Sequence, residues 1–421
     1  MHETRQSADF GQSGESLGPT GARDSLFAEV AAATDLREGP KGVEDFLRSL
    51  LLKPPGSLKA LARQLSWPVP VAAAVRRELE RRGYLGRERG LGLSDSGRRL
   101  CEDWLPWRGL LRRCPKCDGA GWQVDSKVVA SLLPKIEAVC RRRPEVDVTL
   151  DQALATPETN LRRSLELIST VGLYGRKVIF LGDDDWTSAC LATVLRNTAE
   201  GAPGECQIMV IDIDQRIVDG LNRWAGDENF SLEAIRHDLR QAKPDFERFS
   251  ADVVFTDPPY TEAGLDLFCA WARALLPEDR GTFFLCYPLR DAKSQFQLEG
   301  IWRRWGFALQ DFRPGWNRYE GGSLHAGQSA LWRFEAVECG PGAASAFPVK
   351  HSIYTFDYRS SHVRAYRCRQ CGWRFWVGKG QRWTTIEALK KAGCENCHAQ
   401  VFERQESRKA AVDKALGKGS R

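Results

Sequence analysis

The side chains best suited to chemistry in this chain are aspartates that directly follow short apolar runs. They are Asp183, Asp184 and Asp185, which come after the run 177–181 and Gly182, Asp212 after the run 207–211, and Asp257 after the run 252–256. Continuous apolar runs of this length are typical of buried strands in a parallel sheet. Ligands bind such sheets at the carboxyl ends of their strands. We therefore expect these acids to meet in one pocket.

The turn Asp183-Asp184-Asp185 is unusual, because nucleoside-binding turns at this place commonly carry glycines. Two unscreened carboxylates about 4 Å apart repel each other by roughly 4 kcal/mol at an effective dielectric of about 20, so three in a row need a compensating cation. That cation could be a divalent metal or a polyamine. A carboxylate can also take the proton from an ammonium, whose pKa is about 10. Alternatively, one aspartate caps the following helix and another faces water.

Two further acids stand where a nucleoside would need them. Asp212 can accept hydrogen bonds from both ribose hydroxyls, and Asp238, about one unit later, can meet the exocyclic amine of adenine. We expect Gly182 and Pro258 to line the same cofactor pocket. Asp214 is expected to cap the next helix.

The turn Asp257-Pro258-Pro259-Tyr260 places a carboxylate and an aromatic ring in a rigid setting after its strand. The prolines have no amide hydrogens, and the tyrosine ring can lie over a planar or cationic substrate. Such a turn orients an NH group for attack on an electrophilic carbon, although isolated matches are often plain turns. We predict catalytic roles for Asp257 and Tyr260.

The elements around these acids predict the fold that positions them. Helical segments separate the apolar runs, and the later runs 281–286 and 329–334 are typical of further strands. The alternation predicts a Rossmann-like α/β fold over residues 176–346, with a mainly parallel sheet covered on both faces. Together with the acids at its strand ends, this fold is expected to be that of an S-adenosylmethionine-dependent transferase. A segment over 106–175, with a helix over 161–173 ending at Gly175, leads into it.

The N-terminal residues predict a winged helix over 41–105, preceded by a flexible extension over 1–40. The expected helices begin at Val43, span 58–65 behind the capping residue Ser57, and span 71–82 up to Gly83, with a wing over 84–94. The third helix is basic but contains Glu80. Binding of DNA by this helix and dimerisation or packing therefore both stay open.

Six of the thirteen cysteines form three Cys-x-x-Cys pairs. The pairs Cys368/Cys371 and Cys394/Cys397 indicate a structural zinc ribbon over 347–405, with His398 as a substitute ligand, followed by a basic tail over 406–421. The ribbon's Trp and Arg residues could stack on nucleic acid or fill its own small core. The pair Cys114/Cys117 is half a metal site that Cys101 and Cys140 could complete, and whether it binds metal stays open.

Composition restricts the classes of protein to consider. The chain has no run of about 18 apolar residues, so we expect no membrane-spanning helix. Its 61 basic residues are almost matched by 55 acidic ones, so the net charge of +6 does not itself indicate nucleic acid. Paired cysteines without a signal segment predict a reducing, cytoplasmic setting.

Three motifs together resemble one known family. Gly182-Asp183-Asp184-Asp185, Asp212-Ile213-Asp214 and Asp257-Pro258-Pro259-Tyr260-Thr261 look like those of the N(4)-bis(aminopropyl)spermidine synthases, the branched-chain polyamine synthases of thermophiles. The winged helix and the Cys-x-x-Cys-x-Gly-x-Gly segment are similar to the same family. The resemblance covers about Val43 to Phe334, and the C-terminal ribbon departs from the compact members.

The resemblance implies an aminopropyltransferase of polyamine biosynthesis. Such an enzyme moves aminopropyl groups from decarboxylated S-adenosylmethionine to the secondary amine of spermidine and releases methylthioadenosine. It implies a base within the acidic triplet, for which we choose Asp184, an acceptor-binding Asp257 and a ribose-binding Asp212. The decarboxylated co-substrate has an ammonium and no carboxylate, which three aspartates favour over intact S-adenosylmethionine. The ribbon leaves open a different acceptor, and the winged helix leaves open a homodimer.

Two other functions compete with this one. An S-adenosylmethionine-dependent amino-methyltransferase acting on nucleic acid would use the same Asp-Pro-Pro-Tyr turn, with the winged helix and the ribbon as binding modules, but the acidic first turn repels phosphate. A zinc-containing regulator that only senses a nucleoside or polyamine would be expected to lack the acceptor-side acids, which are present.

Overall fold

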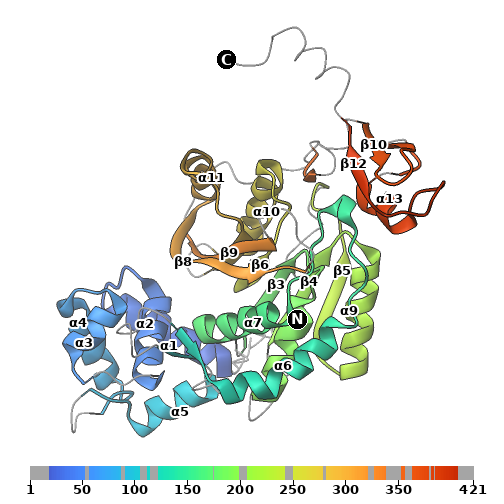
Figure 1. The fold of residues 1–421 in the computed structure, drawn as a ribbon. Helices are drawn as coiled ribbons and strands as arrows, with labels where there is room; N and C mark the ends of the chain where they lie inside the picture. The colour runs from blue at the N-terminus through green and yellow to red at the C-terminus, as the bar shows by residue number, and fades with distance from the viewer. Residues whose placement is uncertain are drawn as a thin grey trace, which may run out of the picture.

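The computed structural model describes residues 19–52, 56–86, 91–104, 111–113, 122–173, 175–198, 206–241, 250–277, 281–320, 327–337, 352–355, 363–378, 381–383 and 385–405. These residues form a helical N-terminal domain, a central α/β domain and a small C-terminal domain (Figure 1). Among the helices described, none combines the length and the apolar character needed to span a membrane.

The central domain is built on a seven-stranded sheet of order β5-β4-β3-β6-β7-β9-β8. Its strands are β3 (Lys177–Leu181), β4 (Gln207–Asp212), β5 (Leu232–Arg236), β6 (Val253–Thr256), β7 (Thr282–Tyr287), β8 (Phe307–Arg318) and β9 (Gln328–Ala336). Neighbouring strands from β5 to β7 are parallel, and β9 pairs antiparallel with both β7 and β8. The predicted mainly parallel sheet is confirmed. The sequence pattern did not indicate β5 and β8, because polar residues interrupt both strands and much of β8 is exposed.

Helices cover both faces of this sheet. One face packs against α6 (Ser126–Cys140), α7 (Pro157–Val171), α8 (Thr187–Thr198) and α9 (Gln215–Glu228), and the other against α10 (Glu262–Leu275) and α11 (Ala292–Arg304). Alternate residues of β3 enter different cores, Val178 and Phe180 on the first side and Ile179 and Leu181 on the second. Since successive side chains of a strand point to opposite faces, a strand covered on both sides is apolar throughout.

The described part of the N-terminal domain contains α1 (Pro19–Ala33), α2 (Gly39–Leu52), α3 (Leu58–Leu65), α4 (Val69–Arg81) and α5 (Asp95–Trp104). Ser57 caps α3 by accepting a hydrogen bond from the amide of Ala60 at 3.2 Å, as predicted. An isolated bridge between Leu85 and Leu93 lies where the wing was expected. The prediction of a flexible extension over 1–40 is wrong for its second half, because α1 buries Phe27 and Val30 in the core that it shares with α2 and α4.

The segment between the two domains differs in detail from the prediction. A short hairpin of β1 (Leu111–Arg113) and β2 (Trp122–Val124) precedes α6, and Cys114 and Cys117 lie outside the described residues. A 3-10 turn spans Val148–Leu150. The helix α7 is capped at its C-terminus by Gly172 instead of Gly175.

The small C-terminal domain is a three-stranded sheet with one helix. It contains β10 (Arg364–Cys368), β11 (Arg374–Val377), β12 (Phe402–Arg404) and α13 (Ile386–Ala392), and β10 lies between the other two strands. Its core includes Tyr366, Phe375 and Leu389. The residues 406–421 lie outside those described.

Candidate active site

The acidic turn that follows β3 lies at the carboxyl edge of the sheet, and its three aspartates have different surroundings. Gly182 adopts a φ of +69°, a left-handed conformation that glycine takes without strain. The buried carboxylate of Asp183 accepts hydrogen bonds from the amide and hydroxyl of Ser188 in the first turn of α8. Burial and the neighbouring Asp185 raise the pKa of Asp183 well above its usual value. Asp183 thus stabilises the first turn of α8.

Asp185 is neutralised by a buried arginine. Its carboxylate accepts hydrogen bonds from the amide (3.2 Å) and hydroxyl (2.7 Å) of Thr187 and pairs with Nη1 of Arg163 on α7. The Arg163 side chain has 0% exposure. Two of the candidate acids share this cation, because its Nη2 donates to Asp257 at 2.8 Å. The prediction that all three aspartates need an external metal or polyamine is therefore wrong for Asp185.

Arg163 is held by a network that the sequence did not reveal. Its Nε donates to the side-chain oxygen of Asn317 on β8 (2.9 Å), and its Nη2 donates to the hydroxyl of Tyr319 (2.9 Å). Tyr319 in turn donates to Asp257 and lies 2.8 Å from the hydroxyl of Ser329. Burial alone would lower the pKa of Arg163, but its acidic neighbours raise it above the usual value. The guanidinium thus stays charged and joins α7, the turn after β3 and the turn after β6.

The turn after β6 directs its tyrosine toward the acid. The hydroxyl of Tyr260 donates to Oδ1 of Asp257 at 3.0 Å, and its ring packs edge-on against Tyr287 at 5.4 Å. Pro258 is buried. Burial raises the pKa of Asp257, although Arg163 lowers it. Asp257 and Tyr260 lie together as predicted, with the phenol holding the carboxylate.

Asp184 is the aspartate of the triplet with the fewest partners in the described structure. It is half-buried, and its Oδ2 accepts a hydrogen bond from the amide of Ala153 at 2.7 Å. Within the described residues, no Lys or Arg forms a salt bridge with it. Burial, followed by the charges of Asp185 and Asp257, raises its pKa well above the usual value. Of the three aspartates, it is thus the most accessible one.

Asp212 ends β4 directly beside the acidic turn. It is buried, and its two oxygens accept the amides of Asp183 (2.9 Å) and Asp214 (2.8 Å). Burial raises its pKa to about 6. Asp214 caps α9 by accepting the amide of Arg216 at 2.9 Å, which confirms its predicted role.

Asp238 follows β5 and is half-buried. Its carboxylate accepts hydrogen bonds from Nε (2.9 Å) and Nη2 (2.8 Å) of Arg240, so it faces a cation of its own. The guanidinium of Arg240 lies 5.7 Å from the ring of Tyr354, whose pKa is raised by burial. The Tyr354 segment, residues 352–355, is anchored where the hydroxyl of Thr261 donates to the carbonyl of Ile353 at 2.6 Å. No pattern in the sequence indicates that this later segment reaches the loops after β5 and β6.

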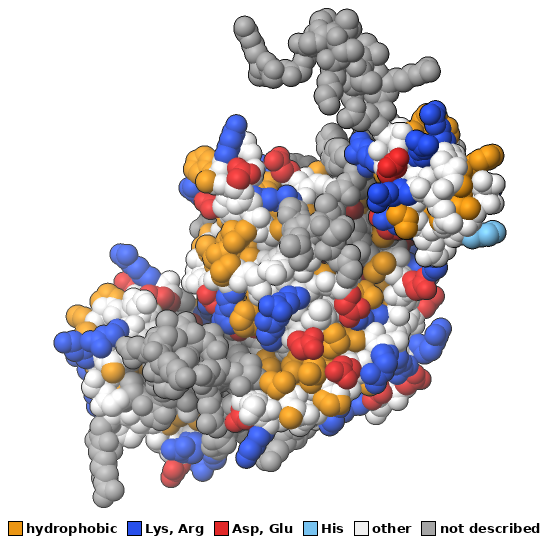
Figure 2. Space-filling model, viewed as in Figure 1, with side chains coloured by type: hydrophobic (Ala, Val, Ile, Leu, Met, Phe, Trp, Pro, Cys, Tyr) orange, Lys and Arg blue, Asp and Glu red, His pale blue; other side chains and the backbone are white. Residues whose placement is uncertain are grey.

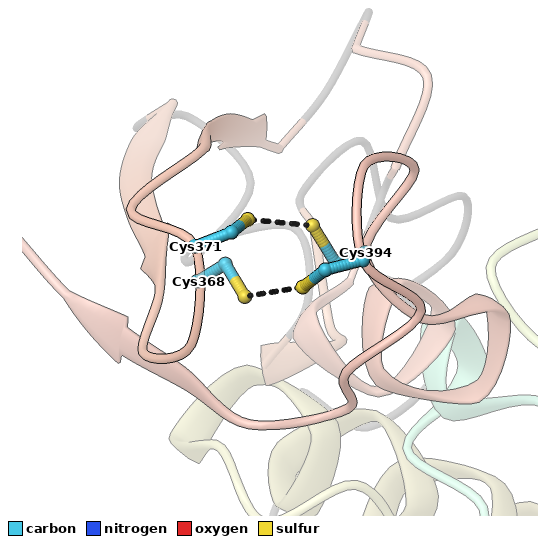
Figure 3. Close-up of side chains that lie close together, drawn as sticks. Cys368, Cys371 and Cys394 are labelled. Atoms are coloured by element: carbon cyan, nitrogen blue, oxygen red, sulfur yellow. Dashed lines mark hydrogen bonds between the residues drawn. The ribbon is translucent and has the colours of Figure 1, made fainter.

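The predicted zinc ligands gather at one point of the C-terminal domain. The Sγ atoms of Cys368, Cys371, Cys394 and Cys397 all lie within 4.8 Å of one another. The pairs Cys368/Cys397 and Cys371/Cys394 are 3.5 and 3.4 Å apart (Figure 3). Tetrahedral zinc with Zn–S bonds of about 2.3 Å requires S–S distances of about 3.8 Å. Four thiolates complete such a site, and the exposed His398 is not in the group.

Comparison with known proteins relates this chain to one family model and to several similar proteins. Residues 131–341 match the family model described as the branched-chain polyamine synthase A C-terminal domain. An uncharacterised protein of Methanocaldococcus jannaschii is 33% identical over 380 residues, which cover 90% of this chain and 92% of that protein. The N(4)-bis(aminopropyl)spermidine synthase of Thermus thermophilus is 33% identical over 240 residues, 57% of this chain and 65% of that enzyme.

A solved structure is also similar over most of the chain. It is the branched-chain polyamine synthase from Thermus thermophilus in complex with N4-aminopropylspermidine and 5'-methylthioadenosine. The sequence identity is 26%, the match covers 79% of this chain and 97% of that chain, and the TM-score is 0.47.

Proposed function

Because this chain belongs to the branched-chain polyamine synthase family, we propose that it transfers the aminopropyl group of decarboxylated S-adenosylmethionine to an amine of a polyamine such as spermidine. The enzyme is a transferase of polyamine biosynthesis. A reducing, cytoplasmic setting, which the Cys-x-x-Cys pairs of the sequence predict, is part of this proposal.

One observation carries the proposed chemistry. Asp183 serves a helix start and Asp185 is paired with Arg163, whereas Asp184 has no cationic partner in the described structure. A carboxylate left without a cation beside two other acids is suited to bind a polyamine ammonium and to take its proton. Its raised pKa brings it closer to that of an amine, which eases this transfer. We assign Asp184 as the base.

The transfer balances with this assignment. The acceptor ammonium gives its proton to Asp184, and the freed lone pair forms a bond to the carbon attached to the sulfonium. The C–S bond breaks and its electron pair stays on sulfur, so that neutral methylthioadenosine leaves. Asp184 then releases the proton to solvent. Asp257 and Tyr260 are proposed to hold the acceptor amine beside it.

The nucleoside side of the pocket is proposed at the neighbouring strand ends. Asp212 is the candidate for the ribose hydroxyls and Asp238 for the adenine amine, with Gly182 and Pro258 lining the pocket. The support is geometric, because the amide of Asp183 donates to Asp212 and so joins the ribose side to the acidic turn. Intact S-adenosylmethionine would bring a carboxylate toward these acids, so the decarboxylated form should bind more tightly.

Zinc is proposed for the C-terminal domain. Cys368, Cys371, Cys394 and Cys397 would hold it, and its contribution would be to the folding of that domain. The four converging thiols support this assignment. A homodimer through the N-terminal helices stays a prediction.

The deciding experiment is mass spectrometry of polyamines incubated with the protein and either co-substrate. We expect a mass gain of one or more aminopropyl groups with decarboxylated S-adenosylmethionine and no gain of methyl groups with S-adenosylmethionine. Calorimetry should find tighter binding of the decarboxylated form. Methylation of an amine or of nucleic acid, together with the opposite order of affinity, would establish the amino-methyltransferase instead.

A further inference from the structure

The C-terminal domain has an outward sheet face that its own core does not use. In the antiparallel pair of β10 and β11, Tyr366 lies opposite Phe375, and both are buried in the domain core. The flanking pairs therefore point to the other face, because side chains alternate along a strand. These pairs are Ala365 with Trp376 and Arg367 with Arg374.

The aromatic residues of this region are exposed where a small core would bury them. Trp376 is 57% exposed, and Trp373, in the turn between the two strands, is 52% exposed. The domain core takes Trp383 instead, as a partly buried member. The exposed tryptophans are therefore not accounted for by the need of a small domain for apolar filling.

The charges of the same face do not compensate one another. Arg367 and Arg374 are directly opposite in the register, an arrangement that destabilises an antiparallel pair, and both are exposed. Neither forms a salt bridge within the described structure, whereas the nearby Arg382 pairs with Glu395 at 2.6 Å. Glu403 lies opposite Arg367 on β12, but its carboxylate accepts a hydrogen bond from Gln405.

The wider domain is basic as well. Among its described residues from 363 to 405, the basic ones are Arg364, Arg367, Arg369, Arg374, Arg382, Lys390, Lys391 and Arg404, and the acidic ones are Glu387, Glu395 and Glu403. The eight positive and three negative charges leave a surplus of five. Figure 2 shows Lys and Arg side chains beside hydrophobic ones over this domain, at the upper right. An anionic partner would offset the cost of holding these arginines together.

We infer that the outward face of β10 and β11, with Trp376, Arg367 and Arg374, together with the exposed Trp373 in the turn beside it, binds single-stranded RNA. Flat exposed rings beside arginines match unpaired bases that stack and phosphates that pair with guanidinium groups. A duplex would hide its bases from both tryptophans. An acidic protein surface would need the arginines but not two exposed rings. The candidate active site is acidic, so the RNA would be bound by the ribbon and not by the catalytic pocket.

Fluorescence anisotropy of the full-length protein tests this inference. The probes are a labelled 12-nucleotide RNA of mixed sequence, the DNA strand of the same sequence, and the RNA duplex, all without polyamine, which would itself bind the strands. We expect the single-stranded RNA to bind most tightly. Trp373→Ala and Trp376→Ala should each weaken it about fivefold or more, the lower end for loss of one base stack. The double variant Arg367→Gln/Arg374→Gln should weaken it and flatten its salt dependence.

Matched controls separate this face from other surfaces. Arg98→Gln/Arg99→Gln removes two exposed arginines from α5, and Phe296→Ala removes an exposed ring from α11, and neither should change RNA binding. Bound metal should equal wild type in every ribbon variant, which shows that the ribbon is folded. Aminopropyl transfer should also equal wild type, because the proposed catalytic pocket does not include the ribbon. The inference is overturned by tighter binding of the duplex or the DNA strand, by no binding, or by loss of affinity in the control variants alone. Because transfer is measured separately, a failure here leaves the proposed function intact.

Discussion

Replacing Arg163 with methionine tests how the acidic site is held together. The arginine side chain is 0% exposed, and its partners Asp185 and Asp257 are 4% and 15% exposed, so solvent screens these pairs very little. Removing one partner of such a pair costs about 3–5 kcal/mol. Without Arg163, Asp185 keeps two hydrogen bonds from Thr187, and Asp257 keeps one from each of two tyrosines. We therefore expect a cost at the lower end of this range, about 3 kcal/mol. For the central domain this is a fall in Tm of about 6–12 °C.

The loss of folding stability in Arg163→Met should depend on pH in a defined direction. Without the guanidinium, burial raises the pKa of Asp257 further, so the folded variant binds more protons than the unfolded chain, whose carboxyl pKa is about 4. The free energy of unfolding then falls as pH rises from that value through the raised pKa. The difference from wild type should therefore be larger at pH 8 than at pH 5, measured by thermal unfolding in matched buffers.

Two further variants separate the role of Arg163 from that of its neighbour and from that of its charge alone. Arg162 is the neighbouring residue on α7, forms no salt bridge within the described structure and lies over the ring of Trp316 at 5.4 Å. Its replacement by methionine should cost about 1 kcal/mol or less, the value of such a contact. Arg163→Lys keeps the charge but replaces the two guanidinium nitrogens that reach Asp185 and Asp257 with a single ammonium nitrogen, so it should recover stability more than turnover. Equal losses in Arg162→Met and Arg163→Met, or a loss that shrinks toward pH 8, would refute the role assigned to Arg163.

Three further predictions concern the candidate ligand sites. Asp184→Asn should lower turnover about 10²–10⁴-fold, which is the usual contribution of a general base. Calorimetry should find the binding of methylthioadenosine nearly unchanged in this variant. Unchanged turnover would show that Asp184 is not the catalytic base. The pKa of Asp212 is about 6, so its carboxylate is mainly ionised above that pH. Methylthioadenosine should therefore bind more tightly at pH 7.5 than at pH 5. Asp212→Asn should abolish this pH dependence. Cys371→Ser should lower the zinc content, measured by elemental analysis, below the one ion per chain expected for wild type. If aminopropyl transfer is unaffected in this variant, the ribbon is not part of the active site.

The strands that carry the acids were predictable because they are buried on both sides. Residues 208–211 before Asp212 and residues 253–255 before Asp257 are apolar without interruption, and this pattern places both carboxylates at the same edge of the sheet. The helix α1 was not predictable in the same way, since its buried side chains are few and stand among alanines and polar residues. The strand β8 lies at the sheet edge and carries polar residues, so it lacks a strand pattern.

Arg163 was missed for a different reason. It stands within the helix α7, where an arginine is ordinarily read as part of a solvated face. Asn160, one turn earlier, is also fully buried and donates to the carbonyl of Asp185 at 2.8 Å, so a polar stripe faces the sheet edge from this helix. Spacing within α7 cannot reveal that stripe, because its partners come from loops far away in the sequence.

The arrangement explains how three adjacent aspartates can coexist. A turn with three unpaired carboxylates would be unstable without a ligand. Here Ser188, in the first turn of α8, donates hydrogen bonds to Asp183, and Arg163 forms an ion pair with Asp185. Asp184 has no cationic partner among the described residues, and burial, followed by the charges of Asp185 and Asp257, raises its pKa. The ion pair of Asp185 with Arg163 therefore stabilises the turn, while the negative charge of Asp185 still raises the pKa of Asp184. Asp185→Asn should for this reason weaken Asp184 as a base even though Asp185 never contacts the amine.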